Sequence, residues 1–127
     1  MLNPFKSFNK RKLGEQFEQQ ACRYLQKQGL KLKERNADFR VGEIDLVMQD
    51  GDTLVFVEVR FRAQQGFGGA AASVDRRKQK KLIKAAQLYL LKHFANNPPP
   101  CRFDVVAMED SQQGPCINWI KNAFLAG

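Results

Sequence analysis

Charged residues stand at alternate positions in two neighbouring segments that are otherwise rich in Val, Ile, Leu and Phe. Glu43 and Asp45 lie in the first segment, residues 43–48, and Glu58 and Arg60 lie in the second, residues 53–61. Because successive side chains of a β-strand point to opposite faces, residues two apart share one face. We therefore expect these carboxylates and the guanidinium to gather at one end of a β-hairpin.

The register of this hairpin decides how the carboxylates meet. A two-residue turn at Asp50-Gly51, a dipeptide typical of hairpins, would place Glu43 opposite Glu58 and Asp45 opposite Phe56. The other face would be apolar except for the threonine nearest the turn, and would carry Ile44, Leu46, Met48, Val55, Val57, Val59 and Phe61. A three-residue connection would instead put Asp45 and Glu58 on opposite faces.

The chemistry of such a cluster follows from its charge. Two ionised carboxylates about 5 Å apart repel each other by roughly 3 kcal/mol at an effective dielectric constant of about 20. The pair needs a neutralising cation, or one member takes up a proton. Mg²⁺ suits this role, because it binds one or two carboxylates together with water and phosphate oxygens. The alternative is a solvated charged end in which Glu43 or Glu58 pairs with Arg60, and alternation alone favours this simpler interpretation.

The rest of the chain predicts the elements that hold the hairpin. Periodicity indicates helices at residues 10–28 and 75–94, and strands at residues 30–35, 43–48, 53–61, 102–108 and 116–120. Gly29 ends the first helix, and the prolines at 98–100 stop the second. Asp104 stands in an otherwise apolar strand, where we expect it to pair with Arg102. The order α-β-β-β-α-β-β predicts an α/β fold, with helices packed on one mixed sheet.

Length and composition limit the class of protein. The chain has 127 residues, and we expect a flexible leader at 1–9, one domain at 10–120 and a tail at 121–127. The 21 basic against 13 acidic residues give a net charge of +8, which favours nucleic acid as a partner before an anionic membrane surface. No run approaches the ~18 apolar residues of a membrane span. The three cysteines form no C-x-x-C pair, which indicates reduced, packed thiols. We expect a cytoplasmic protein with no membrane partner.

An ordered set of motifs extends from about Leu13 to Met108. Its members are Gly14-Glu15, Tyr24-Leu25, Gly29, Arg35-Asn36, GEIDLV at 42–47, LVFVEVRFR at 54–62, Ala85-Ala86, Tyr89-Leu90 and RFDVVA at 102–107. This set resembles the uncharacterised bacterial YraN-type family, which belongs with the restriction-endonuclease-like nucleases and is predicted to be related to archaeal Holliday-junction resolvases. Each motif alone is weak, and the ordered set with these spacings is specific for the family.

The resemblance implies a restriction-endonuclease-like core, nucleic-acid binding and a metal site. By position, Asp45 and Glu58 match the metal-binding acids, and Glu15 matches an acid on the first helix that completes the site. From the helix alone, Glu15 projects about 140° from the apolar stripe and would be an exposed surface residue. Arg60 stands where the E-x-K pattern has lysine. Arginine holds phosphate well but is essentially never deprotonated, so Arg60 supplies charge and not proton transfer.

Lys78 is the candidate to replace the missing lysine. It lies at helical spacing with Leu82, Ala85, Ala86 and Tyr89, which places it on the stripe that faces the sheet. The alternative is a lysine at the edge of the helix, with its stem on apolar surface and its ammonium group in water. Spacing alone does not separate the two interpretations.

Together these features predict hydrolysis of phosphodiester bonds in nucleic acid, DNA before RNA, with Mg²⁺ or Mn²⁺ as cofactor. Asp45, Glu58 and Glu15 are the candidate metal ligands, and Arg60 and Lys78 are candidates for stabilising negative charge. The candidate backbone contacts are Lys10, Arg11, Lys12, Arg62, Arg76, Arg77, Lys80 and Lys81. An inactive nucleic-acid-binding module and a protein–protein adaptor are the alternatives, and the choice between monomer and homodimer is open.

Overall fold

The computed structural model describes residues 6–62, 74–109 and 116–126, and the side chains of residues 6–11 and of Arg62 lie outside this description. The described residues form two helices and a five-stranded sheet. In chain order the elements are α1 (Lys6–Lys27), β1 (Lys31–Phe39), β2 (Gly42–Asp50), β3 (Thr53–Arg62), α2 (Arg76–Phe94), β4 (Cys101–Glu109) and β5 (Cys116–Phe124). The mixed α/β class and the element order predicted from the sequence are confirmed.

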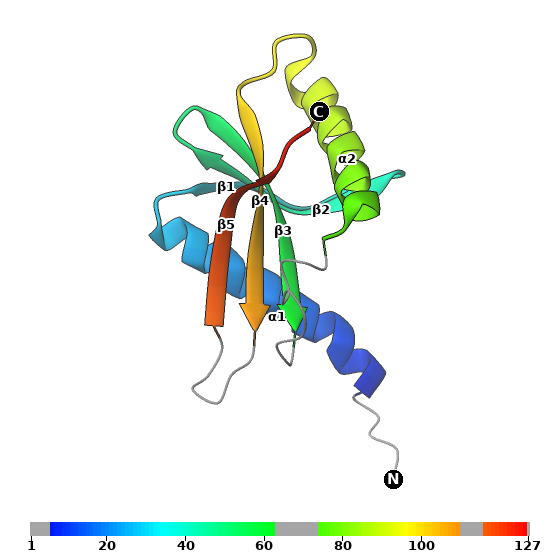
Figure 1. Ribbon diagram of the computed structural model, residues 1–127, viewed down its shortest axis with the longest axis vertical. Coiled ribbons are helices and arrows are strands. Elements are labelled where there is room, and N and C mark those ends of the chain that lie inside the picture. The colour runs from blue at the N-terminus through cyan, green and yellow to red at the C-terminus, as the bar shows by residue number, and fades with distance from the viewer. Residues whose placement is uncertain (1–5, 63–73, 110–115, 127) are drawn as a thin grey trace.

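The strands lie in the sheet in their chain order, β1-β2-β3-β4-β5. Neighbouring strands are antiparallel except for β3 and β4, which run parallel. A parallel pair needs a long crossover, and α2 lies in this connection. The two helices cover opposite faces of the sheet, α1 on one side and α2 on the other (Figure 1).

Each helix closes one apolar layer against the sheet. On the α1 side, Ala21 and Leu25 pack with Leu46 of β2 in one buried cluster. On the α2 side, Tyr89 meets Phe56 of β3 edge to face, with ring centroids 5.8 Å apart. Burial of each large apolar side chain contributes about 1.5–3 kcal/mol, so the two layers hold β2 and β3 from both faces.

The ends of the described elements differ from the predicted ends. α1 begins at Lys6, so residues 6–9 of the expected leader are helical. β1 continues past residue 35 to Phe39, and β5 continues past residue 120 to Phe124. Residues 121–124 of the expected tail therefore belong to the sheet, because Phe124 stacks on Phe103 with ring centroids 4.9 Å apart. The sequence did not predict this extension, because the polar pair Lys121-Asn122 interrupts the apolar residues of the strand.

The structure also bears on two expectations drawn from composition, the burial of the cysteines and the absence of a membrane span. Cys22 is buried as expected, but Cys101 and Cys116 are exposed at the starts of β4 and β5, so the expectation of packed thiols is wrong for these two. Among the described residues, neither helix combines the length and the apolar character needed to cross a bilayer.

The β2–β3 hairpin turns one residue later than predicted. Asp50 pairs with Thr53, so the turn consists of Gly51 and Asp52 rather than Asp50 and Gly51. Gly51 has a φ of 59°, in the left-handed region that glycine enters without steric cost. The turn residue that needs glycine is therefore the first of the two.

This change moves the strand pairing by two residues. Val47, and not Asp45, lies opposite Phe56, so that detail of the prediction is wrong. A shift by an even number of residues leaves every side chain of a regular strand on its face, because the side-chain period is two. The shift therefore brings Asp45 towards Glu58 along the strands.

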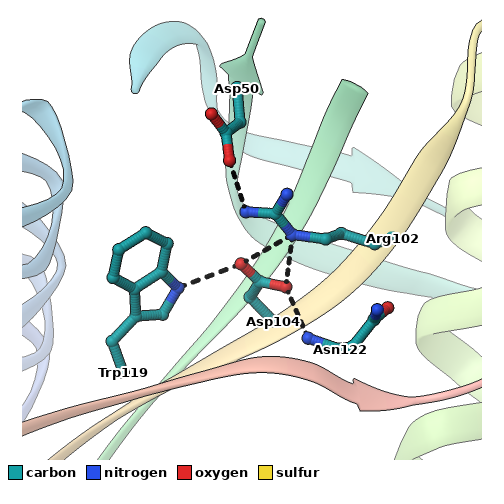
Figure 2. Close-up of polar contacts among 5 residues, drawn as sticks. All are labelled: Asp50, Arg102, Asp104, Trp119 and Asn122. Atoms are coloured by element: carbon teal, nitrogen blue, oxygen red, sulfur yellow. Dashed lines mark hydrogen bonds and ion pairs between the residues drawn. The ribbon is translucent and has the colours of Figure 1, made fainter. Parts of the chain in front are cut away.

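Beside the turn, a buried polar network joins β2, β4 and β5 (Figure 2). Asp104 is fully buried, and its carboxylate accepts hydrogen bonds from Arg102 Nε at 3.0 Å, Trp119 Nε1 at 2.9 Å and the Asn122 backbone N–H at 3.0 Å. Arg102 also pairs with Asp50, with Nη2 and Oδ2 2.9 Å apart. The predicted pair of Asp104 with Arg102 is thus confirmed, as part of a larger set of contacts that links the strand ends.

We predict that Asp104→Asn destabilises the protein. The amide removes the charge that Arg102 faces and one of the acceptors that Trp119 and Asn122 use, which should lower the free energy of unfolding by about 2–3 kcal/mol. Urea denaturation followed by circular dichroism measures this. Asp52→Asn, at an exposed acid in the hairpin turn, is the matched control and should change stability by less than about 0.5 kcal/mol. Equal stabilities of the two variants would contradict the role given to Asp104.

Candidate metal centre

The strands β2 and β3 separate at one end of the hairpin. Within the described residues their ladder ends where Leu46 lies opposite Val57. Beyond that pair, the backbone N–H of Val59 donates to Asp45 Oδ2 at 2.9 Å. A side chain of β2 thus takes the place of a backbone carbonyl, and the carboxylate of Asp45 lies in the fork between the two strands.

The fork also changes which residues of β2 face which helix. Leu46 packs on the α1 side, but Ile44 packs on the α2 side together with Ala37 of β1. The prediction that Ile44 shares a face with Leu46 is therefore wrong. The reason is an irregularity in both strands, since Asp45 turns into the fork and Asn36 of β1 has a left-handed φ of 53°.

Four carboxyl groups gather around this fork, and we call them the acidic cluster. Oxygen atoms of Glu18, Glu43 and Asp45 all lie within 4.8 Å of one another. The side chain of Glu58 forms a hydrogen bond with Asp45. The structure thus brings Glu43, Asp45 and Glu58 together at one end of the hairpin, as the sequence predicted, and adds Glu18 from α1.

Glu18 is half-buried between α1 and the sheet. The Asn36 amide bridges it to the neighbouring acid when its nitrogen faces the carboxylates, 2.9 Å from Glu18 Oε1 and 3.0 Å from Glu43 Oε1. Burial, and then the charges of Asp45 and Glu43, raise the pKa of Glu18 from its ordinary value of 4.5 to about 7. The cluster therefore carries more negative charge than the protein around it compensates.

Glu58 is the most buried member, with a side chain 4% exposed. Burial, followed by the hydrogen bond and the charge of Asp45, raises its pKa from 4.5 to about 9, while Lys78 and Arg60 act in the opposite direction. Two carboxyl groups can share a hydrogen bond only when one of them carries a proton. At neutral pH the metal-free pair of Asp45 and Glu58 thus keeps one proton.

Lys78 reaches this site from the opposite side of the sheet to Glu18. Its Nζ lies 3.4 Å from Glu58 Oε2, so helical spacing correctly placed it on the sheet-facing stripe of α2. The helix starts rigidly there, because Asp75 caps it by accepting a hydrogen bond from the Lys78 backbone N–H at 2.9 Å. Arg60 is half-buried on β3 and also contributes positive charge at Glu58.

Glu15, the acid that sequence position suggested, is not among the clustered carboxylates of the described residues. It is exposed and lines a hollow between α1 and β1. Glu18 occupies the inner position instead, and a signal for it exists in the sequence. At about 100° per residue, Glu18 lies only about 20° from Leu25 and about 40° from Cys22 around the helix, on the face that is buried.

The four predicted backbone contacts on α2 are exposed, and Lys84 extends them to a basic surface that we call the basic face: Arg76, Arg77, Lys80, Lys81 and Lys84. Four of these residues line a hollow of about 500 Å³ together with Val41 of the β1–β2 turn. This turn approaches α2 closely, since a Cβ at Gly42 would lie 3.3 Å from the Lys81 carbonyl oxygen. The hollow thus adjoins the strand that carries Glu43.

The remaining predicted contacts lie elsewhere. Lys12 is exposed on α1 and lines the hollow that also contains Glu15. The side chains of Lys10, Arg11 and Arg62 lie outside the described residues.

The donor set of the acidic cluster fits a hard divalent cation. Mg²⁺ and Ca²⁺ bind oxygen ligands at about 2.0–2.6 Å, so two oxygens on one ion are at most about 4–5 Å apart. The oxygens of Glu18, Glu43 and Asp45 already meet that limit at 4.8 Å. A divalent cation would also compensate the negative charge that raises the pKa of Glu18 to about 7.

Comparison with known proteins identifies the family. The model of the family described as "Uncharacterised protein family UPF0102" matches residues 17–108. The chain belongs to the UPF0102 family. A UPF0102 protein of Herminiimonas arsenicoxydans is 58% identical over 112 residues, which cover 88% of this chain and 86% of that protein. A UPF0102 protein of Janthinobacterium sp. (strain Marseille) is 56% identical over 113 residues, which cover 89% of this chain and 87% of that protein. A UPF0102 protein of Alcanivorax borkumensis is 51% identical over 117 residues, which cover 91% of this chain and 94% of that protein.

Membership in UPF0102 confirms the resemblance to the YraN-type family. The family match contains Glu18, Glu43, Asp45, Glu58 and Lys78, because all five lie within residues 17–108. The description of UPF0102 names no activity, so the function has to be argued from the site itself.

We predict that the metal-free UPF0102 protein loses stability as the pH rises. A carboxyl group whose pKa is raised by folding keeps its proton after the unfolded chain has lost it, so the free energy of unfolding falls between the two pKa values. For Glu18 this range runs from 4.5 to about 7, and for Glu58 from 4.5 to about 9. Urea denaturation in the presence of a chelator should show a loss of at least about 1.4 kcal/mol between pH 5 and 9, the equivalent of one pKa unit.

Glu58→Gln is the comparison for this experiment, because it keeps the shape and removes the titration. Its stability should vary less with pH than that of the wild type, above all between pH 7 and 9. An unchanged pH profile in this variant would show that Glu58 does not hold a proton in the folded protein.

Proposed function

We propose that this UPF0102 protein is a metal-dependent nuclease that hydrolyses phosphodiester bonds in nucleic acid, with DNA as the preferred substrate. The observation that carries the proposal is the acidic cluster, in which three carboxylates lie within 4.8 Å and a fourth is hydrogen-bonded to one of them. Glu18, Glu43 and Asp45 would hold Mg²⁺ or Mn²⁺, with Glu58 beside them, and Glu18 takes the place first given to Glu15.

A bound divalent cation supplies an activated water and neutralises charge on the scissile phosphate. The chain's own residues keep the ligands in place. The Val59 N–H fixes the carboxylate of Asp45, and the Asn36 amide fixes Glu18 and Glu43 relative to each other. Such supporting hydrogen bonds orient ligand groups before the ion arrives.

Positive charge on the α2 side complements the acids. The ammonium group of Lys78 lies 3.4 Å from Glu58, where it can hold a water molecule or a phosphate oxygen near the cluster. Arg60 stays protonated throughout and stabilises a phosphate without exchanging protons. The roles that one lysine combines in the E-x-K pattern are thus divided between Lys78 and Arg60.

The basic face provides the path for the nucleic-acid backbone. Lys78 and Lys81 stand one helical turn apart on α2, so the acidic cluster and the basic hollow are neighbours along the same helix. A strand whose phosphates contact the basic face would extend through the hollow beside Val41 towards Glu43. Contacts of this kind position the substrate without reading its sequence.

Arg60 in the place of lysine favours a second candidate, a module of the same fold that binds nucleic acid without cutting it. Lys78 argues against this candidate, because it returns an ammonium group to the site at 3.4 Å from Glu58. Salt-dependent binding without cleavage in either Mg²⁺ or Mn²⁺ would establish the inactive module. Absence of any salt-dependent affinity for nucleic acid would leave the protein–protein adaptor.

We predict that labelled single-stranded or branched DNA is cleaved in Mg²⁺ or Mn²⁺. Asp45→Asn and Glu18→Gln should each lower the cleavage rate by about 100-fold or more, because each replaces a charged carboxylate ligand by a neutral amide. Asp52→Asn, an exposed acid at the other end of the hairpin, should cleave at the wild-type rate. Titration calorimetry with Mn²⁺ should show binding that Asp45→Asn weakens and Asp52→Asn does not. A wild-type rate in Glu18→Gln would remove this residue from the site.

We predict that Lys80→Ala and Lys84→Ala weaken DNA binding by removing phosphate contacts. Each should reduce the slope of log affinity against log salt by about 0.7–0.9, the value for one phosphate contact. Lys92→Ala, an exposed lysine near the other end of α2, is matched in charge and helix and should leave the slope unchanged. Equal effects of all three substitutions would mean that net charge, and not the basic face, determines the affinity.

A further inference from the structure

A hollow of about 580 Å³ lies between α1 and β1, on the α1 side of the acidic cluster. The side chains that line it are Lys12, Glu15, Gln16 and Gln19 of α1 and Arg35 and Asn36 of β1. Lys12 and Glu15, and likewise Gln16 and Gln19, lie three positions apart, so the four residues of α1 form one continuous side of the helix. Nothing in the proposed metal chemistry accounts for this surface.

The hollow and the acidic cluster share a wall. Asn36 lines the hollow, and its amide also lies 2.9 Å and 3.0 Å from oxygens of Glu18 and Glu43 when the nitrogen faces them. The guanidinium of Arg35 lies close enough to Glu18 to act on its charge. A molecule in the hollow would therefore be held directly beside the carboxylates that bind the cation.

The lining determines the kind of molecule that fits. Every lining residue is polar or charged, which excludes an apolar ligand or a hydrophobic peptide. The amides of Gln16 and Gln19 each offer a donor and an acceptor, the combination that pairs with the edges of nucleic-acid bases. Arg35 and Lys12 add the positive charge that a phosphate needs.

The size of the hollow narrows the choice further. Sites of about 300–1,000 Å³ hold one small ligand, and 580 Å³ falls within this range, so the hollow suits a single nucleotide and not a double helix. In a duplex the base edges are paired and stacked, and a base enters a side pocket only after it leaves the stack. The nucleotide in the hollow must therefore be unpaired.

We propose that the hollow between α1 and β1 holds one unpaired nucleotide of a DNA strand next to the phosphate at the acidic cluster. The inference rests on the proposed nuclease function and specifies its substrate as DNA with an unpaired nucleotide at the cleavage point. Gln16 and Gln19 contact the base, and Arg35 contacts the adjoining phosphate. Continuous duplex DNA lacks a nucleotide that can enter and binds through the basic face alone.

The experiment compares a short fluorescent single-stranded oligodeoxynucleotide with the duplex of the same sequence, by anisotropy in the presence of Ca²⁺. The double variant Gln16→Ala with Gln19→Ala should bind the single strand about tenfold more weakly and the duplex unchanged, since base contacts are lost and backbone contacts are kept. Gln20→Ala with Gln26→Ala is the matched control on the same helix, and both of its affinities should equal those of the wild type. Circular dichroism confirms that both double variants fold.

Two results would overturn the inference. The first is an unchanged affinity of the Gln16→Ala, Gln19→Ala variant for the single strand, and the second is an equal loss for single strand and duplex. Cleavage assays separate this failure from failure of the nuclease proposal. If the variant cuts both substrates in the wild-type ratio, the hollow is not used and the nuclease stands. If the wild type cuts neither substrate but the variant shows the selective loss, the hollow binds an unpaired nucleotide in a protein without activity.

Discussion

The hydrogen bond from the Val59 N–H to Asp45 is the interaction on which the site depends. Where two antiparallel strands part, each loses the backbone partners that the other supplied, and a buried donor without a partner costs about 1–3 kcal/mol. The Asp45 carboxylate accepts the Val59 N–H at 2.9 Å and removes that cost. The strands can therefore separate, and the space between them admits Glu18 from one side of the sheet and Glu58 from the other. The separation of β2 and β3 therefore creates the space in which the acidic cluster forms.

Two aspartates of this sheet show how an acid that supports the fold differs from an acid that serves a site. Asp104 is fully buried, and the neighbours that contact it are donors: a guanidinium, an indole N–H and a backbone N–H. Within the part of the chain that the structure describes, Asp45 accepts from one backbone donor, and it lies among the carboxyl groups of Glu18, Glu43 and Glu58. Such a gathering of like charges opposes folding and is expected where a ligand supplies the missing charge.

Much of this arrangement follows from the sequence, because it rests on regular periods. The period of two along the hairpin predicts Asp45 and Glu58 at the same end of the hairpin, and the shifted turn brings them closer along the strands. The helical period places Lys78 on the face that meets Glu58. The side of Ile44 could not be predicted, because Asp45 and Asn36 interrupt the alternation through contacts between strands, and no period records such contacts.

The sequence pointed to Glu15, whereas the structure brings Glu18 into the acidic cluster, and the reason lies in α1. The apolar stripe predicted for this helix centres on Leu13, Phe17 and Ala21, yet Leu13 is 44% exposed, and the buried face is formed by Ala21, Cys22 and Leu25. The sequence shows which helix faces are apolar, but tertiary packing decides which part of a long helix touches the sheet. The glutamate to consider for the site is therefore Glu18, which lies in the turns of α1 that are most buried.

The position of α2 connects the chemistry with the charge of the whole protein. Its buried side carries Leu82, Ala85 and Tyr89 into the core, its first turns bring Lys78 to Glu58, and its exposed side carries the basic face. These three sides belong to one helix, so packing of the core fixes the distance between the acidic cluster and the basic face. Catalysis by positioning requires such fixed distances, because small displacements of reacting groups lower rates steeply. In the proposed function, the net charge of +8 attracts nucleic acid, and the basic face on α2 directs that attraction towards the acidic cluster.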